Sequence, residues 1–234
     1  MSRFAVNDKN NFKDGGINHN MAIVIDGIIG AGKSTVGHFL SEMLDVPLYQ
    51  ELKDDGKDSR AQRMLDLFYA NPERWSAIIQ VMFLNDRFKD LKRIEKDGDS
   101  AILDRSIYGD EIFAKTIHDR GEMTEDEFEI YRDLLHNMLQ HINPPEVLIY
   151  IDVTVDTAMQ RIRERARSTE GDTIPRDYMK DLRRNYEAWY EAFDLCPKVR
   201  IDFNDCALDH DGKINPEVTQ KILDAIGPFI GTKE

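Results

Sequence analysis

The residues with the clearest chemical role form a glycine-rich loop between an apolar run, Met21 to Ile25, and an amphipathic stretch, Ser34 to Leu44. Backbone N–H groups in such a loop point inward and the helix behind it adds its positive end, so the loop holds a polyphosphate. Lys33 would reach the β- and γ-phosphates, and the Ser34 hydroxyl would lie on Mg²⁺. An ordinary glycine-rich turn is the alternative, which the flanking strand and helix disfavour. The predicted nucleotide site comprises Gly27, Ile28, Ile29, Gly30, Ala31, Gly32, Lys33, Ser34 and Thr35.

A second candidate pair stands at the end of the short apolar run 101–104, where Asp104 is followed by Arg105. The carboxyl ends of parallel strands meet at the ligand crevice, so we expect both side chains to face the phosphate loop. There Asp104 can hold the magnesium ion through water, and Arg105 can neutralise charge on a phosphoryl group in transfer. A helix cap followed by a solvated arginine is the alternative for this pair.

Glu51 follows the predicted strand 47–50 and therefore points at the same crevice. A carboxylate in that place can accept the proton of an attacking hydroxyl group. However, Asp54, Asp55 and Asp58 follow shortly after it, and a run of acidic residues is usually a solvated surface. The residues alone leave both interpretations of Glu51 open.

Arginines gather around the end of a helix predicted over 155–166. Arg161 and Arg165 lie one turn apart on one face of that helix, and Arg167 follows it. The next stretch, 168–173, contains a glycine and is typical of a lid that brings arginines onto a transferred phosphate. A basic helix surface with Glu164 as ion-pair partner is the alternative.

The helix predicted over 72–97 carries Gln80 and Arg87 seven residues apart, and therefore on one face. The Gln80 amide has both a donor and an acceptor, so it can bind two atoms of a base edge at once. A solvated glutamine on a helix surface is the alternative.

These candidates need a scaffold in which strand ends converge, and the rest of the sequence predicts one. Apolar runs alternate with long helical patterns, which is typical of an α/β fold with a parallel sheet and helices on both faces. Residues 1–20 are polar and aperiodic, which predicts a flexible tail before one domain over 21–234. The strands are predicted at 21–26, 47–50, 101–104, 146–152 and 198–202, and the helices at 33–45, 58–70, 72–97, 106–120, 124–142, 155–166, 175–194 and 214–228.

The composition limits the classes of function. The 234 residues include 31 basic and 44 acidic ones, for a net charge of −13, which argues against wrapping nucleic acid or lying on anionic lipid. No stretch approaches the ~20 apolar residues of a membrane span and no signal peptide is recognisable, so we expect a cytoplasmic protein without a membrane partner. Cys196 and Cys206 have neither zinc-like nor redox spacing, and we expect both to be reduced.

Taken together, these residues resemble the deoxynucleoside kinase family, which contains deoxycytidine, deoxyguanosine and bacterial deoxyadenosine kinases. The resemblance runs from Met21 to about Asp205. It implies a P-loop kinase fold, with a five-stranded parallel sheet, helices on both faces and an arginine-containing lid. Its motifs are the phosphate loop, Tyr69-Ala70-Asn71-Pro72-Glu73-Arg74-Trp75-Ser76 with Gln80 and Arg87 behind it, Asp104-Arg105-Ser106-Ile107-Tyr108-Gly109-Asp110, and Arg161 to Arg167 with Glu170.

The resemblance implies a catalytic role for three residues: Lys33, Arg105 and Glu51, the last as the base for the nucleoside 5′-hydroxyl. Leu52 follows Glu51 where most of the family has proline. On the nucleotide side the resemblance places the lid arginines on the donor phosphates. It places Asn204, Asp205, Cys206 and Ala207 near the adenine of ATP.

On the nucleoside side, the resemblance implies that Tyr69 and Glu170 hold the sugar 3′-hydroxyl and that Gln80 reads the base edge. Arg87 and Asp110 would form a charged pair that tunes which base fits. The bulky ring of Phe83 would narrow the pocket beside the base, where animal enzymes tend to carry something smaller.

The sequence therefore predicts a Mg²⁺-ATP-dependent kinase for the 5′-hydroxyl of 2′-deoxyribonucleosides, with deoxyadenosine or deoxyguanosine preferred and deoxycytidine next. The resemblance also implies a homodimer through helices 72–97 and 124–142. A nucleoside monophosphate kinase of the thymidylate kinase type is the nearest alternative, but Glu51 would repel its acceptor. The other alternative is a non-catalytic P-loop subunit, which the joint presence of Lys33, Ser34, Glu51, Asp104 and Arg105 disfavours.

Overall fold

The computed structural model describes residues 21–50, 60–164, 174–204 and 214–228. Within these residues, five strands form one all-parallel sheet in the order β2-β3-β1-β4-β5. The predicted α/β architecture with five parallel strands is confirmed, whereas the predicted tail 1–20 lies outside the described residues. The strands are β1 (Ala22–Asp26), β2 (Leu48–Tyr49), β3 (Ala101–Asp104), β4 (Val147–Asp152) and β5 (Lys198–Asp202).

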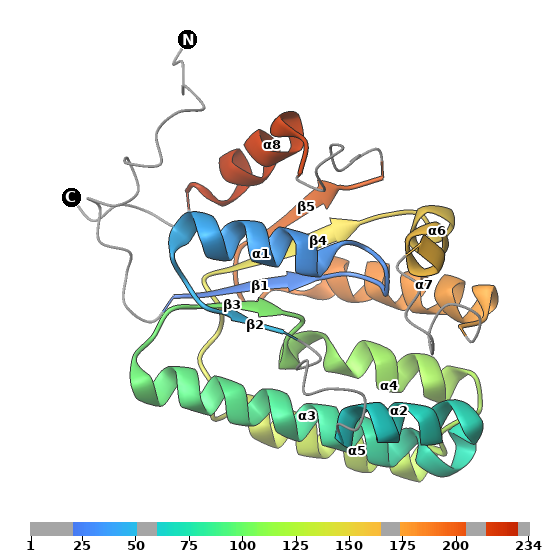
Figure 1. The fold of residues 1–234 in the computed structure, drawn as a ribbon. Coiled ribbons are helices and arrows are strands. Elements are labelled where there is room, and N and C mark those ends of the chain that lie inside the picture. Colours follow the sequence, from blue (N-terminus) through green and yellow to red (C-terminus); the bar gives the residue numbers. More distant parts are fainter. Residues whose placement is uncertain (1–20, 51–59, 165–173, 205–213, 229–234) are drawn as a thin grey trace.

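The central strands are apolar on both faces because helices cover the sheet on each side. In β1, Ile23, Val24 and Ile25 are all 0% exposed. The strand register pairs Ile25 with Asp104 of β3 and Asp26 with Tyr150 of β4. The carboxyl ends of three strands therefore meet at one edge, to which the arrowheads in Figure 1 point.

Helices form two layers around this sheet. Figure 1 shows α1 and α8 on one side of the sheet and α3, α4 and α5 on the other. Where they lie within the described residues, the helix ends are within a few residues of the predicted ones. The helices are α1 (Lys33–Leu44), α2 (Arg60–Ala70), α3 (Pro72–Asp97), α4 (Asp110–Asp119), α5 (Glu125–Leu139), α6 (Val155–Glu164), α7 (Arg176–Ala192) and α8 (Pro216–Ile226).

The start of α3 is set by local chemistry. The Asn71 side chain accepts a hydrogen bond from the Arg74 backbone N–H at 3.2 Å, and Pro72 occupies the first helical position. Both features stabilise a helix N-terminus, since the cap satisfies a free donor and proline already has the helical φ angle. This start fixes the rotation of α3, and with it the side of the helix that carries Gln80 and Arg87.

The helix predicted over 106–120 needs a correction. A short 3₁₀ segment, η1 (Ile107–Gly109), precedes α4, and the Ser106 hydroxyl caps it by accepting from the Tyr108 N–H at 3.3 Å. The Gly109 backbone comes so close to the buried Asp26 carboxylate that a Cβ atom there would collide with Oδ2. The tighter 3₁₀ turn brings the chain into this contact before α4 begins.

Candidate active site

The phosphate loop is built on glycines whose backbone lies in the left-handed region, with φ of 77° at Gly30 and 102° at Gly32. Glycine adopts this conformation without strain because it has no Cβ. Space is also limited: a Cβ at Gly27 would lie 2.6 Å from the Ile151 carbonyl oxygen, and one at Gly30 would lie 2.6 Å from that of Ala158. The loop is thus pressed onto the end of β4 and onto α6.

Lys33 lies across this loop with its side chain almost fully buried. Its Nζ donates hydrogen bonds to the carbonyl oxygens of Gly27 and Ile28, each at 3.1 Å. The ammonium group is therefore held at the mouth of the loop, where a phosphate can reach it. The side chains of Ile28 and Ala31 belong to the hydrophobic core, so these two loop residues can offer only their backbone.

Ser34 and Asp104 meet across the crevice, as the sequence predicts. The Ser34 hydroxyl donates to Asp104 Oδ2 at 2.5 Å. Asp104 is 3% exposed, and its other oxygen, Oδ1, has no hydrogen-bond partner within the described part of the chain. A hydroxyl beside a buried carboxylate with spare acceptor capacity is the donor set expected for Mg²⁺ in a phosphate loop.

Arg105 adopts a positive φ of 68°, which is uncommon for a residue other than glycine. Its backbone N–H donates to the Ile25 carbonyl at 2.8 Å, and its guanidinium lies 4.0 Å from the centroid of the Phe113 ring. The side chain is 6% exposed. Backbone and ring together hold this cation at the inner wall of the crevice.

The predicted base-reading residues lie further along the same crevice. Arg87 Nη1 donates to Asp110 Oδ1 in an ion pair, as expected, and the Arg87 guanidinium lies 5.4 Å from the centre of the Phe83 ring. Burial raises the pKa of Asp110 to about 6, against the opposing effect of the Arg87 charge. Gln80 is 7% exposed and faces the same space.

One cavity of about 410 Å³ extends from the phosphate loop to the predicted base-reading residues Gln80, Arg87 and Asp110. Its size suits a small molecule that is mostly enclosed. The sequence-predicted residues that line it are Ile29, Gly30, Gly32, Lys33, Ser34, Thr35, Tyr69, Gln80, Phe83, Arg87, Asp104, Arg105, Asp110 and Arg161.

A model of the deoxynucleoside kinase family matches residues 23–230 of this sequence. The chain belongs to the deoxynucleoside kinase family. It is therefore an enzyme that phosphorylates deoxynucleosides, as the sequence predicts.

Curated relatives and solved structures agree with this assignment. The chain is 40% identical over 188 residues to a deoxyguanosine kinase of Lactobacillus johnsonii, covering 77% of this chain and 81% of the relative. It is 32% identical over 217 residues to a deoxyadenosine/deoxycytidine kinase of Bacillus subtilis, covering 92% and 97% of the two chains. The structure of deoxyadenosine kinase from M. mycoides with dCMP and dCDP bound superposes with a TM-score of 0.73 at 26% identity, over 89% of this chain and 100% of that one. The predicted P-loop kinase fold is confirmed.

In this deoxynucleoside kinase, Arg161 takes a place that the lid prediction does not specify. It donates to the Ala31 carbonyl at 2.9 Å and to the Phe203 carbonyl at 2.6 Å. Arg161 therefore ties the phosphate loop to the end of β5 while it also lines the cavity. The other predicted site residues, Glu51, Arg165, Arg167, Glu170, Asp205, Cys206 and Ala207, lie outside the described residues.

The kinase also places residues in the cavity wall that the sequence analysis does not single out. Phe113 of α4 and Tyr178 of α7 face it, as do apolar side chains of α2. Burial, with Tyr69 close by, raises the pKa of Tyr178 well above its ordinary value. Each of these residues occupies a position that an amphipathic helix pattern assigns to the core, so only the packing of α2, α4 and α7 around one space could have revealed them.

Proposed function

We propose that this kinase transfers the γ-phosphoryl group of Mg²⁺-ATP to the 5′-hydroxyl of a purine 2′-deoxyribonucleoside, and uses deoxycytidine less well. The observation that carries the proposal is the continuous cavity between Lys33 and Ser34 at one end and Gln80, Arg87 and Asp110 at the other. A donor phosphate on the loop and a base at the ion pair would leave the sugar between them, beside Arg105.

The proposed chemistry is mostly positioning and charge stabilisation. Lys33 and Arg105 lie where they would neutralise charge on the phosphoryl group as it moves. Glu51 is proposed to accept the proton of the 5′-hydroxyl, because it directly follows Gln50, which comes after β2 and lines the cavity.

Ser34 and Asp104 are proposed to hold the magnesium ion. In the described part of the chain, no group of three or more histidine, cysteine, aspartate or glutamate residues could hold a metal ion. Phosphate oxygens and water would therefore complete the coordination, which is how Mg²⁺ is usually bound beside nucleotides. The ion supplies charge neutralisation at the transferred phosphate.

The purine preference rests on the Arg87–Asp110 pair and on the relatives. The buried pair can donate and accept hydrogen bonds at the far edge of a base, and Phe83 beside it leaves little room for a 5-methyl group. The relatives at 40% and 37% identity are a deoxyguanosine kinase and a deoxyadenosine kinase. A nucleoside monophosphate as acceptor is disfavoured, because Arg87 is already engaged by Asp110.

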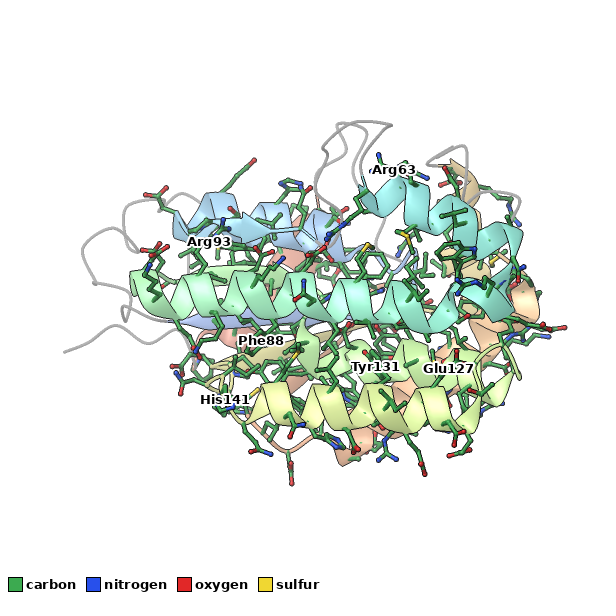
Figure 2. All side chains as sticks on the ribbon, turned by 90° about the horizontal axis from the view of Figure 1, so that it is seen from below. Arg63, Phe88, Arg93, Glu127, Tyr131 and His141 are labelled. Atoms are coloured by element: carbon green, nitrogen blue, oxygen red, sulfur yellow. The ribbon has the colours of Figure 1, made fainter. Side chains whose placement is uncertain are left out.

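A homodimer through α3 and α5 is part of the proposal. Figure 2 shows the two helices side by side, with Phe88 and Tyr131 labelled on them. Together they expose Ile78 at 43%, Val81 at 37% and Ile130 at 68%. A second copy would cover these side chains, and analytical ultracentrifugation of wild type and Ile130→Glu would test it.

No described helix is long and apolar enough to span a membrane, and the cytoplasmic location stays a prediction.

A turnover assay tests the proposed function. Wild-type protein is incubated with ATP, Mg²⁺ and each of the four deoxynucleosides, and the monophosphate product is quantified. We expect the purine nucleosides to give the highest kcat/KM, omission of Mg²⁺ to abolish turnover, and Glu51→Gln to lower kcat at least ~10²-fold. Absence of product from every nucleoside, or a normal kcat in Glu51→Gln, would contradict the respective part of the proposal.

A further inference from the structure

Asp26, the last residue of β1, carries a fully buried carboxylate. It is 0% exposed and follows three residues of β1 that are also fully buried. Its Oδ1 accepts hydrogen bonds from the Gly27 backbone N–H at 2.9 Å and from the Tyr186 hydroxyl at 2.7 Å. One oxygen atom thus joins the first residue of the phosphate loop to α7.

The other oxygen lies against the turn that precedes α4. A Cβ atom on Gly109 would collide with Asp26 Oδ2, so this oxygen lies against the backbone of η1. It has no hydrogen-bond partner within the described ranges. Gly109 immediately precedes Asp110, the acid of the base-reading pair.

Arg105 lies near Asp26 and is held there by both its backbone and its side chain. Its backbone N–H donates to Ile25, the neighbour of Asp26, and its guanidinium is stacked on Phe113. Burial raises the pKa of Asp26, and the charges that oppose this shift belong to Arg105 first and then to Lys33. Arg105 is therefore hydrogen-bonded to the residue before Asp26, and the Asp26 carboxylate acts electrostatically on both cations of the phosphate end.

A buried charge usually destabilises a fold compared with a well-packed apolar residue, so its presence calls for a reason other than stability. We propose that Asp26 is a positioning residue for phosphoryl transfer: its carboxylate fixes the Arg105 guanidinium and the entry to the phosphate loop relative to each other. The inference rests on the proposed function, since it assigns Arg105 to the transferred phosphate. Tyr186 extends this arrangement to α7.

The first test is Asp26→Asn, which keeps the side-chain shape and an oxygen that accepts from Gly27 and Tyr186 but removes the charge. We expect kcat to fall at least ~10-fold, as for loss of a charge that organises a phosphate site, while the nucleoside KM changes less than about threefold. Asp119→Asn, at the far end of α4, is the matched acid-to-amide control and should leave kcat unchanged. Tyr186→Phe keeps the charge and should reduce kcat less than Asp26→Asn.

A double-mutant cycle then asks whether Asp26 acts through Arg105. In an Arg105→Ala background, single-turnover assays should show a further loss of less than about twofold from Asp26→Asn. If the loss in the double variant equals the product of the losses in the two single variants, the inference is overturned. A normal kcat in Asp26→Asn, or an equal loss in Asp26→Asn and Asp119→Asn, would also overturn it.

A second variant keeps the inference testable if Asp26→Asn does not fold. Gly109→Ala places a methyl group against Oδ2 at a φ of −96°, which alanine adopts without strain. It should lower kcat and spare the nucleoside KM, and an unchanged kcat would again contradict the inference. Wild-type turnover distinguishes failure of the proposed function from failure of this inference. An inactive wild type refutes the proposed function, whereas an active wild type with unaffected variants refutes only the role of Asp26.

Discussion

The two ends of the cavity are built in different ways. The phosphate end is built mainly from consecutive residues, Gly27 to Thr35, whose shape is set by glycines with positive φ, and Asp104 and Arg105 from the end of β3 adjoin them. The base end takes Tyr69 from α2, Gln80 and Arg87 from α3, and Asp110 from the start of α4. The first end depends on local sequence, and the second depends on how three helices pack.

The difference in construction matches a difference in the expected task. A phosphate is common to every substrate, so its site can be rigid and uniform, whereas bases differ and must be distinguished by side chains. The charges follow the same division. Lys33 and Arg105 line the cavity at the phosphate end and are proposed to act on the ligand, while Arg87 and Asp110 at the base end form an ion pair with each other.

The largest expected effect comes from the phosphate end. Lys33→Met removes the ammonium group that lies over the loop and should lower kcat/KM by about 10²–10³-fold. The loss should be the same for all four deoxynucleosides, because Lys33 does not reach the base. Steady-state kinetics with each nucleoside check this, and a loss confined to one base would break the division between the two ends.

A smaller and selective effect is expected at the base end. The double change Arg87→Met and Asp110→Ala should relax the preference toward thymidine by about 10-fold in relative kcat/KM, because neither partner is left as an unpaired buried charge. Adding Phe83→Ala should increase the shift. Competition assays with mixed nucleosides measure it directly. A uniform loss for all nucleosides would show that the pair only supports the fold.

The smallest effect is a pH dependence at the base end. Burial raises the pKa of Asp110 to about 6, so acidification from about pH 7 to about pH 5 protonates it and weakens its pairing with Arg87. The nucleoside KM should rise several-fold over this interval in wild type and stay level in Asp110→Asn. A level KM in wild type would contradict the titration.

On acidification, the raised pKa of Asp110 weakens nucleoside binding but increases the stability of the native state. The native protein binds the Asp110 proton more tightly than the unfolded chain, whose ordinary value is 3.8, so this group favours the native state increasingly as the pH falls from about 6 to about 4. A rise in KM on acidification is therefore not explained by unfolding at Asp110. Melting temperatures recorded at each pH provide the control.

The division between the two ends also explains what the sequence could predict. The contact between Ser34 and Asp104 follows from a loop motif and a strand end, both of which are local patterns. The Arg87–Asp110 pair was predictable only through the family resemblance, because the two residues lie on different helices. No residue pattern indicates that Arg161 ties the loop to Phe203 or that Asp26 contacts Gly109, since both contacts arise from the packing of distant segments.

One ratio tests the division most directly: kcat/KM for deoxyadenosine over that for thymidine, measured in wild type, in Lys33→Met and in the Arg87→Met/Asp110→Ala variant. We expect a ratio well above one in wild type, the same ratio in Lys33→Met despite its lower activity, and a ratio about 10-fold lower in the double variant. A wild-type ratio below one, or a ratio that changes equally in both variants, would contradict the assignment of chemistry to one end and base choice to the other.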